Sequence, residues 1–200
     1  DSITLHDGVL SMTATDMEVE LVARTPIESG SEGEITVPAR KFIDICRALP
    51  ADADVTFAVD DSRAIIRSGR SRFTLSTLPA TDYPANEVVA DVIRLDIPQG
   101  ELKRVIDLTQ FAMAQQDVRY YLNGMLFELS EDRLRTVATD GHRLALAEMM
   151  LPESIDVGTE SPRQLIVPRK GVLELARLLD ASEAPLELAI GPSSIRATVG

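Results

Sequence analysis

The sequence has no tryptophan, one cysteine and two histidines. A single cysteine cannot form a disulfide within the chain, which excludes the class of small secreted domains held by disulfides. Cys46, His6 and His142 are also too few for the usual zinc centres, and we expect neither a metal nor another cofactor. The sequence contains no run of about 18 apolar residues that could form a membrane-spanning helix. No secretion signal is visible either, and we expect a cytoplasmic protein.

Basic residues are also scarce. Twenty lysines and arginines stand against 32 aspartates and glutamates, so the net charge is −12. This charge argues against a protein that coats nucleic acid through bulk attraction. The chain is otherwise typical of globular proteins, with 44% hydrophobic residues, and 200 residues allow one large domain or two small ones.

Three blocks of the sequence recur in the same order. LSMTATDMEVELVA at 10–23 is similar to LRTVATDGHRLALA at 134–147, at an offset of 124. VPARKFIDICRALP at 37–50 is similar to VPRKGVLELARLLD at 167–180, and VTFAV at 55–59 to LELAI at 186–190. A period this long indicates a duplicated domain rather than a short solenoid repeat.

The repeat predicts two domains, at residues 1–85 and 91–200, with a linker near Pro79 and Pro84. The second copy has a strand and a helix before its first repeated block, and the first copy does not. We therefore expect about 32 further residues before the first copy, and more after the second.

Each copy is predicted to mix strands and helices. ITLHDGVLSM has the pattern of a hairpin, and VTFAV, AIIRSG and RFTLSTL are predicted strands. A helix follows Pro38, with an apolar stripe of Phe42, Ile45, Cys46 and Leu49, and its counterpart carries Val172, Leu175, Ala176 and Leu179. A further helix at 98–113 is expected to bury Leu102, Val105, Ile106 and Met113 and to expose Lys103, Arg104 and Gln110.

The duplicated helix is basic in both copies. Arg40, Lys41 and Arg47 accompany Asp44, while Arg169, Lys170 and Arg177 accompany Glu174. Exposed helices often carry such charges without any function. Their recurrence at matched positions favours a working surface that contacts a polyanion such as a phosphate backbone.

Four segments carry a resemblance to a known family: RSGRSRFTLSTLPATDYP at 67–84, QDVRYYLNGMLFE at 116–128, RTVATDGHRLA at 135–145 and VPRKGVLEL at 167–175. They resemble bacterial DNA polymerase III beta subunits, the sliding clamps. The resemblance implies an α+β fold of tandem duplicated clamp domains, with antiparallel sheets outside and helices lining a channel.

The resemblance also implies a function. Such proteins are head-to-tail homodimeric rings with three similar domains per chain, which encircle duplex DNA without reading its sequence. They are processivity factors, accessory subunits of a DNA-directed DNA polymerase with no catalytic chemistry of their own. The polymerase and the clamp loader bind them through short linear peptides.

Two sets of residues follow from the resemblance for contact with DNA. The candidates on channel helices are Arg40, Lys41, Arg47, Lys103, Arg104, Arg169, Lys170 and Arg177. A loop with Gln116, Tyr120 and Tyr121 would contact DNA emerging from the ring, because tyrosines can stack on exposed bases. The alternative for the tyrosine pair is a strand with one ring buried. Arg70 and Arg72 are further basic positions that a solvated strand end would also explain.

The resemblance also implies a groove for partner peptides, lined by Leu122, Thr139, Gly141, His142, Arg143 and Leu144, with Arg119 close by. Glycine allows close backbone approach, leucines offer apolar contact, and arginine can hold an acidic group. The alternative for TDGHRL is a plain Asp-Gly turn with a surface histidine.

Two other functions remain open from the residues. Asp140 and His142 could form an acid–base pair of an enzyme, with Asp16 or Glu18, although no nucleophile elbow or phosphate-binding loop supports it. The chain could also be a tandem-domain protein-interaction scaffold that does not bind DNA. The acidic segment 150–164 has no counterpart in the first copy and is expected to be a surface insertion.

Overall fold

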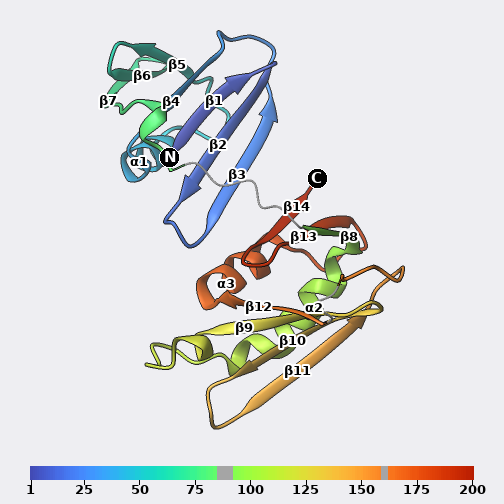
Figure 1. Cartoon of the computed structure of the whole chain (residues 1–200). Helices are drawn as coiled ribbons and strands as arrows, with labels where there is room; N and C mark the ends of the chain where they lie inside the picture. Colours follow the sequence, from blue (N-terminus) through green and yellow to red (C-terminus); the bar gives the residue numbers. More distant parts are fainter. Residues whose placement is uncertain (85–91, 159–161) are drawn as a thin grey trace. The chain divides into compact units, whose positions relative to one another are not determined.

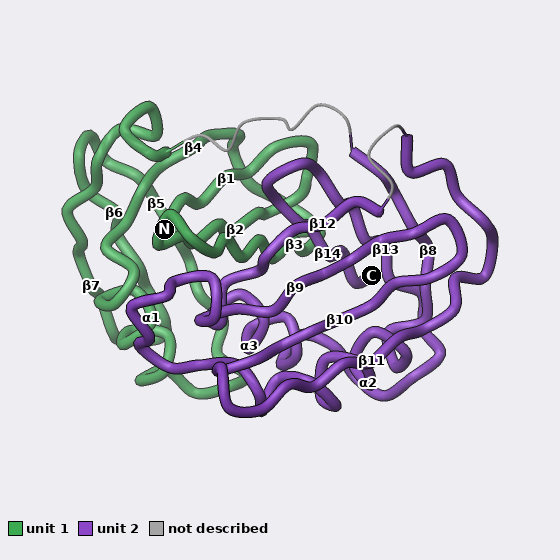
Figure 2. Tube along the Cα trace, turned by 60° about the horizontal axis from the view of Figure 1, so that its bottom comes forward, with its two compact units in different colours: residues 1–86 green, residues 87–200 purple. Residues whose placement is uncertain are grey.

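A computed structural model of the chain describes residues 1–84, 92–158 and 162–200. It separates into two compact units, Asp1–Asn86 and Glu87–Gly200 (Figure 2). The domain ends expected at 85 and 91 lie outside the described residues. Within the described ranges, no helix is long and apolar enough to cross a membrane.

Residues 1–84 of unit 1 form two antiparallel sheets, with a helix between them in the sequence (Figure 1). The first sheet has the order β3-β2-β1-β4, from β1 (Ser2–His6), β2 (Val9–Thr15), β3 (Glu20–Pro26) and β4 (Gly33–Thr36). The chain continues through α1 (Ala39–Ala48) into a sheet of order β5-β6-β7, from β5 (Thr56–Asp60), β6 (Arg63–Ser68) and β7 (Ser71–Ser76), and then η1 (Ala80–Asp82). The predicted hairpin is confirmed. Asp7 and Gly8 join β1 to β2 with positive φ angles of 49° and 72°, as tight hairpin turns require.

Unit 2 repeats the four-stranded sheet and the helix that follows it, but β8 and α2 precede them and have no counterpart in residues 1–84. Its four-stranded sheet has the order β11-β10-β9-β12, from β9 (Gly124–Leu129), β10 (Arg133–Thr139), β11 (Leu144–Met150) and β12 (Arg163–Pro168). Its second sheet has the order β14-β13-β8, from β8 (Ile93–Pro98), β13 (Pro185–Ile190) and β14 (Ile195–Val199). The helical elements are α2 (Gln99–Thr109), η2 (Gln110–Ala112), η3 (Tyr120–Leu122) and α3 (Arg169–Leu178).

The duplication extends to the strand register. Ile3 pairs with Met12 as Phe127 pairs with Thr136, and Ala14 pairs with Leu21 as Ala138 pairs with Ala145. Each of these residues is 124 positions from its counterpart. The predicted α+β fold with duplicated antiparallel sheets is therefore confirmed.

The equivalent helices α1 and α3 each begin directly after a proline, Pro38 or Pro168. The apolar stripe predicted for α3 is confirmed, since Val172, Leu175 and Leu179 are buried. The prediction that Cys46 belongs to the stripe of α1 is wrong, because this thiol is exposed. The core contact of α1 is made instead by Phe42, whose ring meets that of Phe57 edge-on at 6.2 Å.

The helix expected at 98–113 ends earlier. It becomes a 3-10 turn after Thr109, and Met113 is buried just beyond that turn. The Thr109 side chain is also buried, where its hydroxyl lies 3.1 Å from that of Thr136 on β10. Thr136 in turn donates to the Val105 carbonyl at 3.0 Å. The hydrogen bonds of Thr109 and Thr136 hold α2 on the inner face of the sheet. In unit 1, the counterpart of Thr136 is Met12, which is exposed.

The segment after β11 is more than a surface insertion. The amides of Leu151 and Ile155 donate to the carbonyls of Asp132 and Glu131, and Val157 is buried in the core. The expectation of a wholly superficial loop is therefore wrong for residues 151–157. Residues 159–161 lie outside the described residues.

Candidate nucleic-acid and peptide interfaces

The turn between β10 and β11 is built by the side chains of Thr139 and Asp140. The Thr139 hydroxyl donates to the Arg143 carbonyl at 2.7 Å and accepts from the Gly141 amide at 3.1 Å. Asp140 Oδ1 accepts from the amides of His142 and Arg143 at 2.9 and 3.0 Å. Gly141 has φ +88°, a conformation that glycine adopts without strain.

Unit 1 contains the same turn between β2 and β3. The Thr15 hydroxyl donates to the Val19 carbonyl and accepts from the Met17 amide, each at 3.0 Å. Asp16 Oδ1 accepts from the amides of Glu18 and Val19 at 3.1 and 2.9 Å. The Ala-Thr-Asp motif that recurs in the sequence therefore builds a turn in both units.

This role does not fit an acid–base function of Asp140. The amides of His142 and Arg143, together with the Arg143 guanidinium at 3.0 Å from Oδ2, hold the pKa of the Asp140 carboxyl below its ordinary value. A carboxylate stabilised in this way is a poor general acid or base near neutral pH. The His142 side chain is exposed, as the plain-turn interpretation expected.

The loop before β9 packs against this turn. Asp117 accepts from Arg119 Nε at 3.0 Å and Nη2 at 2.9 Å, and from the Arg119 amide at 2.8 Å. These bonds lower the pKa of Asp117 to about 2. Asn123 closes the loop, because its side chain accepts from the Asp117 amide and donates to the Asp117 carbonyl.

Arg119 lies directly beside Gly141. A Cβ atom added to Gly141 would lie 3.2 and 3.3 Å from the two terminal guanidinium nitrogens of Arg119. The structure thus places Arg119 beside the turn that carries Gly141 and Arg143, which is distant from Arg119 in the sequence.

The two leucines predicted for this surface differ in their exposure. Leu122 is buried beneath the loop, while Leu144 is 64% exposed. Phe111 is also exposed and lies under the Arg143 guanidinium, 5.3 Å from the ring centroid to Cζ. Sequence reasoning missed Phe111, although an aromatic residue at the end of an amphipathic helix was the available signal.

The two tyrosines of the loop are both accessible. Tyr120 and Tyr121 lie in η3, are 83% and 50% exposed, and their rings meet edge-on at 5.9 Å. The alternative of a strand with one buried ring is wrong, because this segment is a 3-10 turn. Gln116, just before it, is exposed and has φ +55°.

The basic side chains of the helices differ in the hydrogen bonds and ion pairs that they make. Within residues 1–84, 92–158 and 162–200, Arg40, Lys41 and Arg47 of α1 are exposed and make no hydrogen bond or ion pair. On α3, Lys170 is exposed, Arg177 pairs with Glu174 at 3.3 Å, and half-buried Arg169 reaches the Met113 carbonyl at 3.5 Å. Arg70 and Arg72 are exposed at the β6–β7 hairpin.

The expectation that α2 exposes Lys103 is wrong. This side chain is only 28% exposed, because Nζ pairs with Asp107 at 3.1 Å and donates to the Ala176 carbonyl of α3 at 3.3 Å. Arg104 pairs with Glu101 and donates to the Glu148 carbonyl of β11. These two cations join α2 to its neighbours.

Comparison with known proteins decides the family. Residues 2–87 match the family described as DNA polymerase III beta subunit, N-terminal domain, and residues 96–200 match its central domain. The chain belongs to the DNA polymerase III beta subunit family.

Members of this family include close relatives of the chain. It is 53% identical over 199 residues to the beta sliding clamp of Salmonella typhimurium, covering 99% of this chain and 53% of the relative. It is 54% identical over 192 residues to that of Pseudomonas putida, covering 96% and 51%. The chain thus spans about half the length of the curated relatives it matches.

Solved structures of the family show the same fold. A crystal structure of the DNA polymerase III subunit beta from Pseudomonas aeruginosa matches with a TM-score of 0.92 and 49% identity, covering all of this chain and 54% of that one. The beta subunit of Caulobacter crescentus matches at 0.87 and 38%, covering all of this chain and 55% of that one. Another Pseudomonas aeruginosa clamp, with a TM-score of 0.89 and 48% identity, is bound to griselimycin; the match covers all of this chain and 53% of that one.

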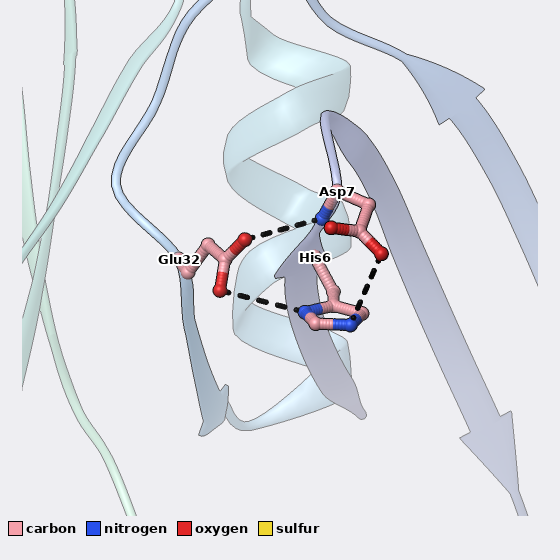
Figure 3. A group of neighbouring side chains, drawn as sticks. All are labelled: His6, Asp7 and Glu32. Carbon is pink, nitrogen blue, oxygen red and sulfur yellow. Dashed lines mark hydrogen bonds and ion pairs between the residues drawn. The ribbon is translucent and has the colours of Figure 1, made fainter.

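One side-chain cluster in this beta-subunit chain was not predicted. His6 Nε2 lies 3.3 Å from an Asp7 oxygen, and His6 Nδ1 lies 3.5 Å from a Glu32 oxygen (Figure 3). All three side chains are exposed, and their ligand-type atoms lie within 4.8 Å of one another. Glu32 pairs with His6 and also accepts from the Asp7 amide at 3.4 Å, so its carboxylate joins the β1–β2 turn to the residue before β4.

Proposed function

We propose that this chain is the part of a DNA sliding clamp that carries its first two domains, residues 1–85 and 91–200. In a chain of the relatives' full length it would form a cytoplasmic homodimeric ring around duplex DNA. That ring would tether the replicative polymerase, and would be opened by a clamp loader. The observation that carries the proposal is the recurrence of exposed cations on one helix of each unit, in a chain of net charge −12.

The charge distribution suits binding by enclosure. A closed ring cannot leave DNA sideways, so tight contacts are unnecessary and weak contacts with phosphates permit sliding. Arg40, Lys41 and Arg47 on α1 have no partner among the described residues, which leaves their charges available to phosphates. Lys103 and Arg104, being engaged within unit 2, would contribute to the local potential rather than bind phosphates directly.

The loop with Gln116, Tyr120 and Tyr121 supports a second kind of DNA contact. Two accessible rings on a short turn can stack on unpaired bases or hydrogen-bond to phosphates. Such contacts suit DNA outside the ring, where the duplex ends in a single strand.

The surface around Gly141 supports peptide binding. Its backbone has no side chain to block an approaching peptide, Leu144 and Phe111 offer apolar contact, and Arg119 and Arg143 offer guanidinium groups for acidic or carbonyl groups. We infer that the polymerase, the loader and griselimycin bind here, with the remaining contacts supplied by residues beyond this chain.

Retention on circular DNA tests the proposal. The full-length clamp, loaded onto nicked circular plasmid, should stay bound during gel filtration and should be lost when the plasmid is linearised. Equal retention on linear DNA would contradict enclosure, and no retention on either would favour the scaffold alternative.

Charge reversal tests the helices. We expect R47E and R177E to weaken binding of the unloaded clamp to linear duplex and to lower the slope of log affinity against log salt by about one each. Retention of the loaded ring on circular DNA should stay unchanged, because enclosure supplies it. The control is R94E, because Arg94 is an exposed arginine on strand β8 paired with Glu187. An equal effect of R94E would show that only net charge matters.

A further inference from the structure

A row of apolar side chains crosses the outer face of the four-stranded sheet in unit 2. Ile166, Leu126, Val137 and Leu146 lie directly opposite one another on β12, β9, β10 and β11. They point away from the helices, because the alternate residues Phe127, Thr136 and Ala147 are the buried ones. Ile166 and Leu146 are 47% and 53% exposed, and the other two are half-buried.

The apolar row lies between two neighbouring rows of outward-facing residues. On one side, the next outward residue of β11 is Leu144, beside the turn that carries Gly141. On the other side lies a polar row, in which Gln164 bonds to Glu128 at 2.6 Å and Arg135 bonds to Glu128 and Glu148 at 3.0 and 3.2 Å. The apolar row is therefore continuous with the candidate peptide surface on one side. On the other side the apolar surface ends at the polar row.

Unit 1 provides an internal control. At the matched positions of its sheet the row is Thr36, Ser2, Thr13 and Val22, in the same register. Glu20 occupies the place of Leu144. Two members of that row, Ser2 and Thr36, are buried, and the Thr36 hydroxyl donates to the Leu78 carbonyl at 2.8 Å. The sheet thus forms with a largely polar row at this place, so the apolar residues of unit 2 are not required for its strands to pair. They occur in the unit whose turn carries glycine rather than Met17.

We propose that the row Ile166–Leu126–Val137–Leu146 is a second contact surface for partner proteins. Its occupant is the extended segment that flanks the anchored peptide in the partner chain, with apolar side chains facing the sheet. This inference rests on the proposed peptide site and extends it beyond Leu144. Four strands at about 4.8 Å spacing make a row of about 14 Å, which four or five extended residues cover.

The polar residues of unit 1 supply the test variants. In the full-length clamp, V137T combined with I166T gives two positions the residues of unit 1, and L146T removes the most exposed member of the row. The matched control is M150T, because Met150 is exposed on the same face of β11 but lies beyond the polar row. Binding is measured for two probes: the bacterium's replicative polymerase, and griselimycin as a compact ligand of the anchoring site.

We expect V137T/I166T and L146T each to weaken polymerase binding by about tenfold. M150T should not weaken it, and griselimycin affinity should stay within about twofold for all variants. Preserved griselimycin binding also shows that the variants are folded.

Three outcomes would overturn the inference. Unchanged polymerase affinity, with griselimycin bound, would refute the row as a contact surface and leave the proposed function standing. Failure of griselimycin to bind the unmodified clamp would refute the peptide site itself. A smaller assembly of the variants in analytical ultracentrifugation would identify the row as a contact between copies of the chain.

Discussion

Met17 and Gly141 adopt the same left-handed backbone conformation in equivalent turns of the two units, with φ angles of +77° and +88°. The threonine and aspartate before them make the same hydrogen bonds, so the turn geometry is imposed on both. Glycine adopts this conformation without cost, whereas a residue with a Cβ atom is strained there by about 1–2 kcal/mol. The turn in unit 1 is therefore strained at one residue, and the turn in unit 2 is not.

The first prediction concerns Met17. We expect Met17→Gly to raise the free energy of unfolding of unit 1 by up to about 1 kcal/mol, because relief of the strain exceeds the added entropy of the unfolded chain. Slower amide hydrogen exchange in β2 and β3 would report the gain. A loss of protection there would contradict the strain at Met17.

The second prediction concerns Gly141. Gly141→Ala strains the backbone by about 1–2 kcal/mol and also places a Cβ atom 3.2 Å from the Arg119 guanidinium. We expect lower thermal stability and weaker binding of griselimycin in a titration. Gly158→Ala is the matched control, since Gly158 has φ +74° and no atom of the described residues lies within 4 Å of an added Cβ. The control should lose stability but keep its affinity; equal loss of affinity in both variants would exclude a local effect at Arg119.

The third prediction concerns pH. Arg119 holds the pKa of Asp117 at about 2, below the ordinary 3.8, so the folded loop prefers the charged carboxylate. The stabilisation is complete above about pH 4 and is lost as the pH falls towards 2. NMR of the Asp117 carboxyl and of the Arg119 Nε proton should show the loop loosening in this window. Asp117→Asn should remove the transition, and a carboxyl that titrates near 4 would refute the ion pair.

The fourth prediction concerns the buried hydroxyl pair. Thr136→Val removes the hydrogen bonds that join β10 to Thr109 and to the Val105 carbonyl, without changing the side-chain volume much. We expect a loss of about 1 kcal/mol in denaturant unfolding. Thr198→Val, at an exposed position of strand β14, is the control and should have almost no effect. A neutral Thr136→Val would show that the pair does not hold α2.

Much of the fold was predictable from local patterns. The alternation around His6-Asp7-Gly8 predicted the hairpin, and the offset of 124 between matching blocks predicted the duplicated sheet, because a repeated pattern of burial requires a repeated register. Cys46 and Lys103 were predicted wrongly for one reason. Helical periodicity says which side chains share a face, but not how far the neighbouring elements extend over it.

For the candidate site, too, local patterns predicted some features and tertiary packing decided the others. Sequence alone determined that Ala-Thr-Asp recurs in both copies, that one helix in each unit is basic, and that the chain is acidic elsewhere, since these depend on neighbouring residues and simple counting. Only the tertiary structure decided that Arg119 lies against Gly141, that Phe111 lies under Arg143, and that four apolar residues align across four strands. Contacts between distant segments depend on how strands pair and how loops close over them, and no local pattern of side chains specifies that geometry.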